Sequence, residues 1–348
     1  MDSKGEMIEG KRILITGGAG FIGTALAERL VERNTVALYD CQLEDMPLTY
    51  STIVGHPNLR TIRGDVRDYE MLGREVEKAN IVVHLAAIVG VNNVLRRGRE
   101  TIDVGVLGTS QVLRAAERSG AVERLMYLST SEVFGPNSFR AHENSHLTVG
   151  PVTEARWAYS IAKLAGEHLV HAYNREAGVP TVIIRPFNVF GPKRLGDHAM
   201  VRFIINALLN RDLEVHGDGS QIRSWCYIED FLEGMLAALA MKEAIGEAFN
   251  LGCAENTLTI YDLARRVIRL CNSSSRIRFN EIAFTDIDVR VPRLDKAKRL
   301  LGYNPRYDLE EAMASTIQWY REHLDAMAPR FLGSERESVS DPAFMRLS

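Results

Sequence analysis

The sequence lacks the features that define several protein classes. Its 348 residues include only four cysteines, at positions 41, 226, 253 and 271, without a C-x-x-C pair or the spacing of metal ligands. We therefore predict reduced, mostly buried thiols and no metal site. The 42 basic residues are balanced by 45 acidic ones, for a formal net charge of -3. This net charge argues against a nucleic-acid scaffold, in which a basic stripe would be expected.

Long apolar runs are also absent. No segment approaches the roughly 20 apolar residues that span a membrane. The N-terminal segment, MDSKGEMIEGK, lacks the apolar core of a signal peptide. With 46% hydrophobic and 25% charged residues, the composition is that of an ordinary globular protein. These observations predict a cytoplasmic protein with neither a nucleic-acid nor a membrane partner.

Short apolar, β-rich segments alternate with helical segments in the first half of the chain. Five such segments are RILITGG, TVALYD, IVVHLAA, RLMYLST and PTVIIRP, and amphipathic or apolar helices separate them. Strands that are continuously apolar and connected by helices pair in parallel, with both sheet faces covered. The pattern predicts an α/β fold with a doubly wound parallel sheet.

The alternation changes beyond Gly191. We predict one domain over residues 11–190, with a returning segment at about 225–255, and a smaller, discontinuous lobe from residues 191–224 and 256–325. The lobe would cover the carboxyl ends of the strands, where ligands bind in such sheets. Between residues 257 and 324 we expect two helices and a loop containing proline and arginine. Residues 326–348 are interpreted as a loosely ordered polar tail.

A glycine turn follows the first predicted strand. Gly17, Gly20 and Gly23 in ITGGAGFIG lie between a strand and a helix, the arrangement that binds the pyrophosphate of a dinucleotide. Asp40 ends the next strand, 17 residues after Gly23 (40 − 23). A carboxylate there accepts hydrogen bonds from a ribose diol and repels a 2′-phosphate, which favours NAD over NADP. The alternative is an ordinary glycine turn with a surface aspartate, which the surrounding strand–turn–helix pattern disfavours.

Tyr159 and Lys163 lie four residues apart in a predicted helix, WAYSIAKLAGEHL. This spacing places both side chains on one helix face. The pair alone is compatible with a packed aromatic residue beside a solvated charge, or with the acid–base centre of an enzyme.

Seven motifs occur together in order, from about Arg12 to His323: TGGAGFIG, GDVRD, HLAA, STSEVFG, YSIAK, RPFNVFGP and GDGSQIRSWCYIED. With them the chain resembles the extended short-chain dehydrogenase/reductase superfamily, in its sugar-nucleotide epimerase and dehydratase branch. The resemblance implies a Rossmann domain over residues 11–190, a substrate-binding lobe, bound NAD, and a nucleoside-diphosphate sugar between the lobes. The cofactor-binding residues that it implies are Gly17, Gly20, Phe21, Ile22, Gly23, Asp40, Asp65, Val66, Ala86, Ala87, Tyr159 and Lys163.

Residues after the strand LMYLST distinguish members of this branch. Dehydratases have an Asp–Glu pair where this chain has Ser131 and Glu132. The Thr-Ser-Glu sequence, together with Arg223 and Arg156, resembles the UDP-glucuronate decarboxylases. By this resemblance Tyr159, with its pKa lowered by Lys163 and by the positive nicotinamide ring, takes the 4′-hydroxyl proton. The implied catalytic set is Tyr159, Lys163, Thr130, Glu132 and Arg223, and the implied substrate-binding set is Ser131, Arg156, Asn188, Arg223 and Arg290.

Several functional alternatives remain open from the sequence. Decarboxylation of UDP-glucuronate would yield UDP-xylose, a UDP-4-keto-pentose, or both. A 4-epimerase acting on UDP-glucuronate or another UDP-sugar shares almost every residue, and a non-catalytic NAD-binding protein is a third possibility. Arg290 could be a surface charge, Glu132 could cap a turn, and His84 is interpreted as a core histidine and not as a base.

Two further expectations come from the resemblance. Relatives usually have asparagine where this chain has Gly105, and an acidic or amide residue where it has Arg293. Relatives also form homodimers through the helix that begins near Val106 and the helix that carries Tyr159 and Lys163. We therefore expect a homodimer.

Overall fold

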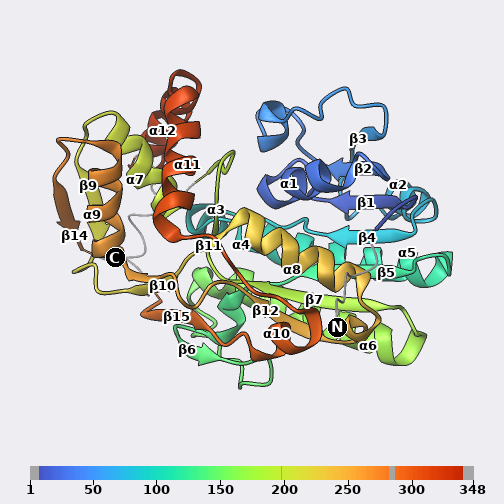
Figure 1. Cartoon of the computed structure of the whole chain (residues 1–348). Coiled ribbons are helices and arrows are strands. Elements are labelled where there is room, and N and C mark those ends of the chain that lie inside the picture. The colour runs from blue at the N-terminus through green and yellow to red at the C-terminus, as the bar shows by residue number, and fades with distance from the viewer. Residues whose placement is uncertain (1–7, 197, 282–286, 340–348) are drawn as a thin grey trace.

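A seven-stranded parallel sheet forms the centre of the molecule (Figure 1). The computed structural model describes residues 8–196, 198–281 and 287–339. The strand order is β12-β7-β5-β4-β1-β2-β3, which confirms the predicted doubly wound α/β fold. The bounds of these strands are β1 Arg12–Thr16, β2 Thr35–Asp40, β3 Leu59–Arg63, β4 Ile81–His84, β5 Arg124–Leu128, β7 Thr181–Pro186 and β12 Ala248–Leu251.

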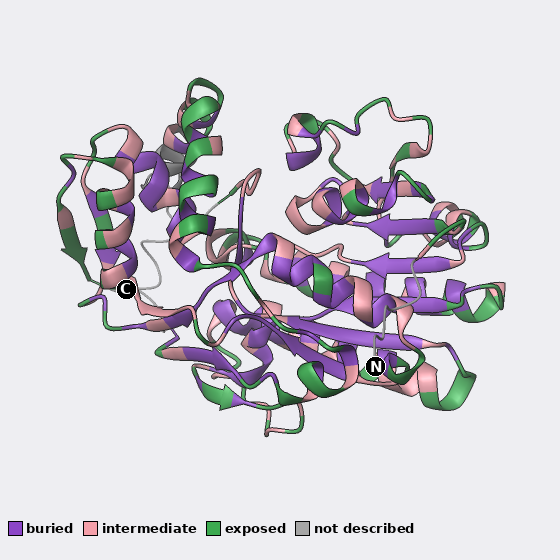
Figure 2. Ribbon diagram, in the orientation of Figure 1, coloured by how far each residue is buried: buried purple, intermediate pink, exposed green. Residues whose placement is uncertain are grey.

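Helices cover both faces of this sheet, so β4 and β5 are buried throughout and β1 is buried from Ile13 onward (Figure 2). Ile13 and Ile15 of β1 belong to the core cluster that includes α1 and α8. Leu14, between them, belongs to the cluster that includes α2, α5 and α6. This alternation explains why the strand sequence is continuously apolar. The helices are α1 Phe21–Leu30, α2 Tyr69–Val76, α5 Thr109–Ser119, α6 Ala158–Ala177 and α8 Ile228–Ala240.

A second region is built from segments far apart in the chain. It contains a four-stranded sheet of order β13-β10-β15-β6 and the two-stranded pairs β11–β8 and β14–β9. Its strands are β6 Asn137–Ala141, β8 Val189–Phe190, β9 Leu213–His216, β10 Ile222–Ser224, β11 Cys226–Tyr227, β13 Thr257–Thr259, β14 Ile277–Asn280 and β15 Val289–Pro292. The accompanying helices are α7 Ala199–Leu208, α9 Ile260–Cys271, α10 Asp295–Leu301 and α11 Leu309–Glu322.

Two expectations for this region were wrong. The segment interpreted as a loop with proline and arginine is strand β15, which pairs with β10 and β6. Three helices, α9, α10 and α11, lie between residues 257 and 324 in place of the expected two. Strand β15 has only four residues, and its partners come from positions far along the chain. Its pairing is therefore tertiary and leaves little periodic signal in the sequence.

The predicted polar tail is also wrong over part of its length. Residues Leu324–Val339 form helix α12. Met327 and Phe331 are buried in the core cluster, at 3% and 9% exposure, which fixes the helix on the molecule. Polar residues and Pro329 obscured this narrow apolar face. Residues 340–348 of the predicted tail lie outside the described residues.

The structure can be compared with the predictions for the cysteines, for a metal site and for a membrane span. All four cysteines are free thiols, and only Cys41 is exposed. Within the described parts of the chain, no cluster of histidine, cysteine and carboxylate side chains suits a metal ion. None of the helices that can be described is long and apolar enough to cross a membrane.

Candidate active site

The glycine turn after β1 is packed too closely for a side chain at Gly17, Gly18 and Gly23. Gly17 has φ 68°, and a Cβ built on it would lie 2.7 Å from the backbone nitrogen of Ala86. A Cβ on Gly23 would lie 2.7 Å from the Cα of Gly18. Gly20 is the N-cap residue of α1. The turn thus leaves backbone and a helix N-terminus at the surface that a pyrophosphate would contact, which fits a bound dinucleotide.

Asp40 is held against this turn. Its Oδ2 accepts a hydrogen bond from the backbone nitrogen of Ala19 at 3.1 Å, and its Oδ1 accepts one from Gln42 at 3.1 Å. Burial raises the pKa of the carboxyl group, and the backbone hydrogen bonds oppose that effect. The carboxylate therefore lies at the end of β2 beside the glycine turn, the position required for a contact with the adenosine ribose.

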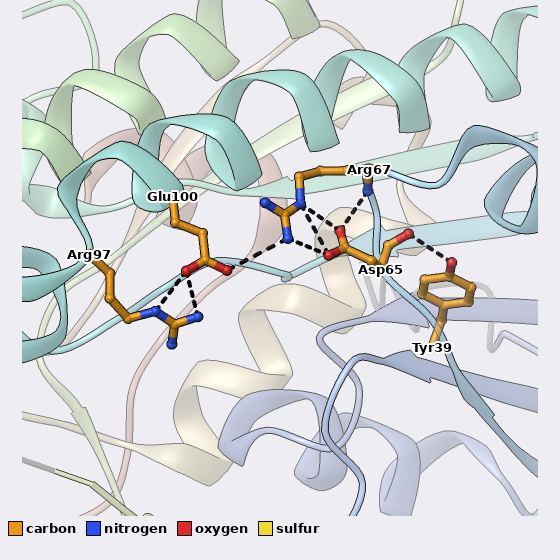
Figure 3. Close-up of polar contacts among 5 residues, drawn as sticks. All are labelled: Tyr39, Asp65, Arg67, Arg97 and Glu100. Atoms are coloured by element: carbon orange, nitrogen blue, oxygen red, sulfur yellow. Dashed lines mark hydrogen bonds and ion pairs between the residues drawn. The ribbon is translucent and has the colours of Figure 1, made fainter.

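Asp65 belongs to a polar network at the end of β3 (Figure 3). Its carboxylate accepts hydrogen bonds from the backbone nitrogen of Arg67 at 2.8 Å and from Nη2 of Arg67 at 2.6 Å. The side-chain bond to Arg67 lowers the pKa of Asp65. Glu100 joins the network, with Oε1 3.6 Å from Arg67 and Oε2 2.7 Å from Arg97. The backbone oxygen of Asp65 accepts the hydroxyl of Tyr39 at 2.9 Å.

The remaining predicted cofactor residues surround the same edge of the sheet. Phe21 and Ile22 open α1 and are half-buried. Ala86 and Ala87 follow β4 and are also half-buried. Val66 is buried next to the helical segment that precedes α5, since a Cβ added to Gly108 would lie 2.6 Å from Cγ2 of Val66.

Helix α6 carries both Tyr159 and Lys163. Nζ of Lys163 donates a hydrogen bond to the backbone oxygen of Leu128 at 2.7 Å and lies 4.8 Å from the ring centroid of Tyr127. Burial lowers the pKa of Lys163 to about 7, opposed by the negative charge of Glu167. The buried amino group of Lys163 is thereby fixed at the end of β5, one helical turn from Tyr159.

The phenol of Tyr159 lies among charged groups from three other segments. Burial raises its pKa, and the charge of Glu132 adds to that effect. A hydrogen bond with Thr130 and the positive charges of Arg290 and Arg194 oppose it. The expectation that Lys163 lowers the pKa of Tyr159 is therefore not met by the protein's own groups, because desolvation dominates and the nearest cations are arginines.

Glu132 and Arg290 meet across two elements. Glu132 lies in the short 3₁₀ helix Ser131–Phe134, directly after Thr130, whose hydroxyl accepts the backbone N–H of Glu132 at 3.2 Å. Nη1 of Arg290, in β15, lies 3.6 Å from Oε1 of Glu132, and the side chains are 8% and 21% exposed. Arg290 is thus a buried partner of Glu132, and the surface-charge alternative is wrong.

Arg223 is paired with Arg290 in the register of the β10–β15 ladder. Its Nη1 donates to the backbone oxygens of Ile222 at 3.1 Å and Asp288 at 3.4 Å. The sequence interpretation joined Glu132 with Arg223, whereas the ion pair of Glu132 in the structure is with Arg290.

The other predicted substrate residues lie on adjacent segments. Nδ2 of Asn188 donates to the backbone oxygen of Ser224 at 3.0 Å, and its φ of 36° marks a sharp bend after β7. Arg156 is buried, with its guanidinium carbon 5.5 Å from the ring centroid of Trp157. Ser131 is buried as well.

His84 is a core residue, as the sequence indicated. It is 1% exposed, and its ring nitrogens contact the hydroxyls of Thr16 at 2.7 Å and Thr109 at 3.1 Å. Burial lowers the pKa of His84 to about 3, so the ring stays neutral.

Three charged residues near the site were missed. Arg194 donates from Nη1 to the backbone oxygen of Val189 at 2.9 Å, and its guanidinium carbon lies 5.3 Å from the ring centroid of Phe21. Glu167 and Arg185 form a buried ion pair behind Lys163. The available signals were weak: Arg194 follows the RPFNVFGP motif, Arg185 begins it, and Glu167 repeats the four-residue spacing from Tyr159 to Lys163.

Comparison with known proteins agrees with this geometry. Residues 13–252 match the model of the "NAD dependent epimerase/dehydratase family". The chain is 35% identical over 322 residues to UDP-N-acetyl-alpha-D-glucosaminuronate decarboxylase of Bacillus cytotoxicus, covering 90% of this chain and 98% of that protein. It is 34% identical to UDP-glucuronic acid decarboxylase 1 of Xenopus tropicalis, covering 91% of this chain and 74% of that protein.

Solved structures with the same fold include an epimerase from Methanothermobacter thermautotrophicus, with a TM-score of 0.83, 29% identity, and 92% and 95% of the two chains covered. UDP-glucuronic acid 4-epimerase from Bacillus cereus, in complex with UDP-glucuronic acid and NAD, aligns with a TM-score of 0.81 and 29% identity, over 89% of this chain and 99% of that chain. The family match spans the glycine turn, Asp40 and the Tyr159–Lys163 helix. The chain therefore belongs to the NAD dependent epimerase/dehydratase family.

Proposed function

We propose that the protein is an NAD-dependent decarboxylase of a UDP-linked uronate, with UDP-glucuronate as the substrate to test first. The observation that carries this proposal is the Glu132–Arg290 pair, whose charges both act on the Tyr159 phenol. A substrate that brings a carboxylate to this site needs a buried cation to receive it, and the arginine fork suits that task. Glu132 then supplies a carboxylate for proton transfer within the same site.

The chemistry begins at the 4′-hydroxyl of the sugar. When bound, NAD would supply the oxidising power, as the acceptor of the hydride from the carbon that carries this hydroxyl. Tyr159 removes the hydroxyl proton, Thr130 holds the oxygen through a hydrogen bond, and the Lys163 ammonium provides positive charge behind the phenol. The resulting C4 ketone is β to the C6 carboxylate. Loss of CO2 breaks the C5–C6 bond, and its electron pair enters an enolate that takes a proton at C5.

Glu132 and Arg290 determine the fate of the ketone in this proposal. Arg290 orients the carboxylate before the C–C bond breaks, and Glu132 delivers the proton to C5 afterwards. Arg223 and Asn188, which line the same side through β10 and the turn after β7, hold the diphosphate, with Arg156 and Ser131 near the sugar. If the hydride is returned to C4 from the reduced cofactor, the product would be UDP-xylose; without that return, the UDP-4-keto-pentose and the reduced cofactor would be released, and the two outcomes can occur together.

The named relatives support a uronate substrate. Two of them are decarboxylases of UDP-linked uronates, one carrying an N-acetyl group and one not. Both names share the UDP group and a uronate, and the two uronates differ in the N-acetyl group. The N-acetylated uronate therefore belongs in the substrate panel beside UDP-glucuronate.

The test is an incubation of the protein and NAD with UDP-glucuronate carrying ¹³C at C6, followed by mass analysis of the gas and of the nucleotide sugars. We expect labelled CO2 and a UDP-pentose. Glu132→Gln and Arg290→Gln should reduce CO2 release by roughly 10²-fold or more, as expected for loss of a proton-transfer or charge-orienting group. Labelled UDP-galacturonate without CO2 would overturn the decarboxylase proposal.

That opposite outcome defines the second candidate, a UDP-glucuronate 4-epimerase. The similarity to the Bacillus cereus 4-epimerase, solved with UDP-glucuronic acid and NAD, favours it as the alternative. The same Tyr159 and Lys163 would form the ketone, which would then be reduced on its other face. The two activities differ in whether the carboxylate survives and in the face on which the ketone is reduced.

We also propose a homodimer. Ile102 and Leu107, 41% and 53% exposed, lie on the helical segments that precede α5 and contact α6. Two large apolar side chains exposed on adjacent turns fit a helix-to-helix interface between two copies. Light scattering should give a dimer mass, and Leu107→Glu should yield the monomer.

A further inference from the structure

A buried ion pair lies directly behind the Tyr159–Lys163 centre. Glu167 follows Lys163 by one helical turn on α6. Arg185, in β7, donates from Nε to Oε1 of Glu167 at 2.8 Å and from Nη2 to Oε2 at 2.6 Å. The two side chains are 4% and 5% exposed. A bidentate pair this deeply buried holds both groups in one geometry.

This pair connects the segments that carry the reacting groups. Oγ of Ser129 donates to Oε1 of Glu167 at 2.5 Å, and Ser129 immediately precedes Thr130. The guanidinium carbon of Arg185 lies 5.0 Å from the ring centroid of Phe134, in the same 3₁₀ helix as Glu132. Glu167 and Arg185 therefore brace helix α6, the end of β5 and the helix of Glu132 against one another.

The charges around Lys163 come from few groups. Its ammonium contacts the Leu128 oxygen and the Tyr127 ring, and it lies near His84, which stays neutral. Burial lowers the pKa of Lys163, and Glu167 is the acid that raises it.

Glu167 itself faces more than one group. Arg185 binds it from β7, and the phenol of Tyr127 on β5 and the half-buried His171 on α6 also feel its charge. The buried carboxylate of Glu167 is thus the counter-charge of two basic side chains, Lys163 and Arg185.

We propose that Glu167 is a positioning residue for the oxidation step: held by Arg185, its carboxylate fixes Ser129 and the strand end with Thr130, and supplies the counter-charge that keeps Lys163 an ammonium. Oxidation at the 4′-carbon is common to the decarboxylase and the 4-epimerase. The inference therefore rests on the Tyr159–Lys163 centre and does not depend on which of those two activities the protein has.

Glu167→Gln tests the role of the charge, because glutamine keeps nearly the same shape. Removing the carboxylate takes away the negative charge that opposes the effect of burial on Lys163 and leaves the Arg185 cation of the former ion pair without its counter-charge, so Lys163 loses its proton at a lower pH. We expect the alkaline limb of the kcat/KM profile to move down by about one to two pH units. Above that limb kcat should fall at least tenfold, while KM changes little. Glu167→Asp, which keeps the charge, should retain the wild-type limb.

Two further variants separate charge from packing. Glu176→Gln removes an exposed carboxylate from the same helix, where it pairs with Arg175, and should leave the profile unchanged. In Glu167→Gln/Arg185→Gln both buried charges are gone, and the alkaline limb should return toward the wild-type position. A purely structural role predicts that this double variant is the more damaged protein, with its limb unmoved.

A readout without turnover completes the test. NAD affinity, measured by calorimetry from about pH 4.5 to 9, should fall at lower pH in Glu167→Gln than in the wild type, since Lys163 lies at the cofactor edge of the site. The inference would be overturned if Glu167→Gln folds and its NAD affinity and kcat/KM both depend on pH as those of the wild type do. If no uronate is turned over by the wild type, the decarboxylase proposal fails and the NAD titration still decides this one.

Discussion

Gly105 permits two helical segments to touch behind the active site, and replacing it should disturb the site from a distance. It lies in the π-helical turn Asp103–Gly108, and a Cβ built on it would lie 2.8 Å from the Cβ of Ala162. Ala162 immediately precedes Lys163 on α6. Neither atom belongs to a flexible side chain, so in Gly105→Ala the backbones must separate.

The magnitude follows from two opposing effects. Overpacking of a core contact costs about 1–3 kcal/mol, and replacing glycine by alanine in a helix recovers about 1 kcal/mol. The net loss in the free energy of unfolding should be about 0–2 kcal/mol. Because the movement falls on α6, kcat should drop more than stability alone suggests.

Ala162→Gly offers a matched relief of the same contact. Alone it should cost about 1 kcal/mol through helix propensity. Combined with Gly105→Ala it should restore the contact distance, so the double variant should be about 1–3 kcal/mol more stable than the sum of the two single effects. Urea unfolding and kcat of the four proteins measure this coupling. Additivity within about 0.5 kcal/mol would refute the steric argument.

Three other expectations follow from the site. Tyr159→Phe should reduce turnover by roughly 10²–10⁴-fold while calorimetry shows unchanged NAD binding, since only the transferable proton is removed. Asp40→Ala should weaken NAD binding by roughly tenfold and improve the NADP/NAD affinity ratio in fluorescence titrations, because it removes both a ribose acceptor and a charge that repels the 2′-phosphate. His84 has a pKa of about 3 in the folded protein against 6.5 for the free side chain, so the unfolded chain binds the proton first as pH falls. Stability should therefore decrease below pH 6.5 by about 1.4 kcal/mol per pH unit from this group, and urea midpoints of His84→Gln should show a shallower acid dependence.

The parts of the molecule visible in the sequence are those defined by local spacing. The strand–turn–helix around Gly17, the carboxylate at Asp40, and the four-residue interval between Tyr159 and Lys163 each depend on neighbours in the chain. The buried strands such as β1 are continuously apolar because both of their faces are covered. Periodicity and propensity report such features directly.

Features that depend on distant pairing could not be read in this way. Arg290 meets Glu132 only because β15 lies between β10 and β6 in the sheet. In the sequence, β10 precedes β15 by more than sixty positions, and β6 precedes it by more than one hundred and forty. The helix α12 was hidden because only a few apolar residues, among them Met327 and Phe331, fix it to the core. A short strand, or a helix with a narrow apolar face, is stabilised mainly by tertiary contacts. The local sequence therefore carries little signal for such an element.

The same division separates two steps of the proposed reaction, formation of the ketone and loss of CO2 from it. The groups that form the ketone lie mostly on one helix and one strand end, at Tyr159, Lys163 and Thr130, so a change in the remote lobe leaves them in place. The groups that we propose act on the ketone come together through the β10–β15–β6 sheet. A substitution that weakens the pairing of β15, such as Val291→Pro, should therefore reduce CO2 release while the protein still oxidises the sugar. NADH absorbance and CO2 release can be measured in one experiment. We expect CO2 release to fall while NADH formation is retained. A parallel loss of both signals would mean that the sheet also supports the oxidation site.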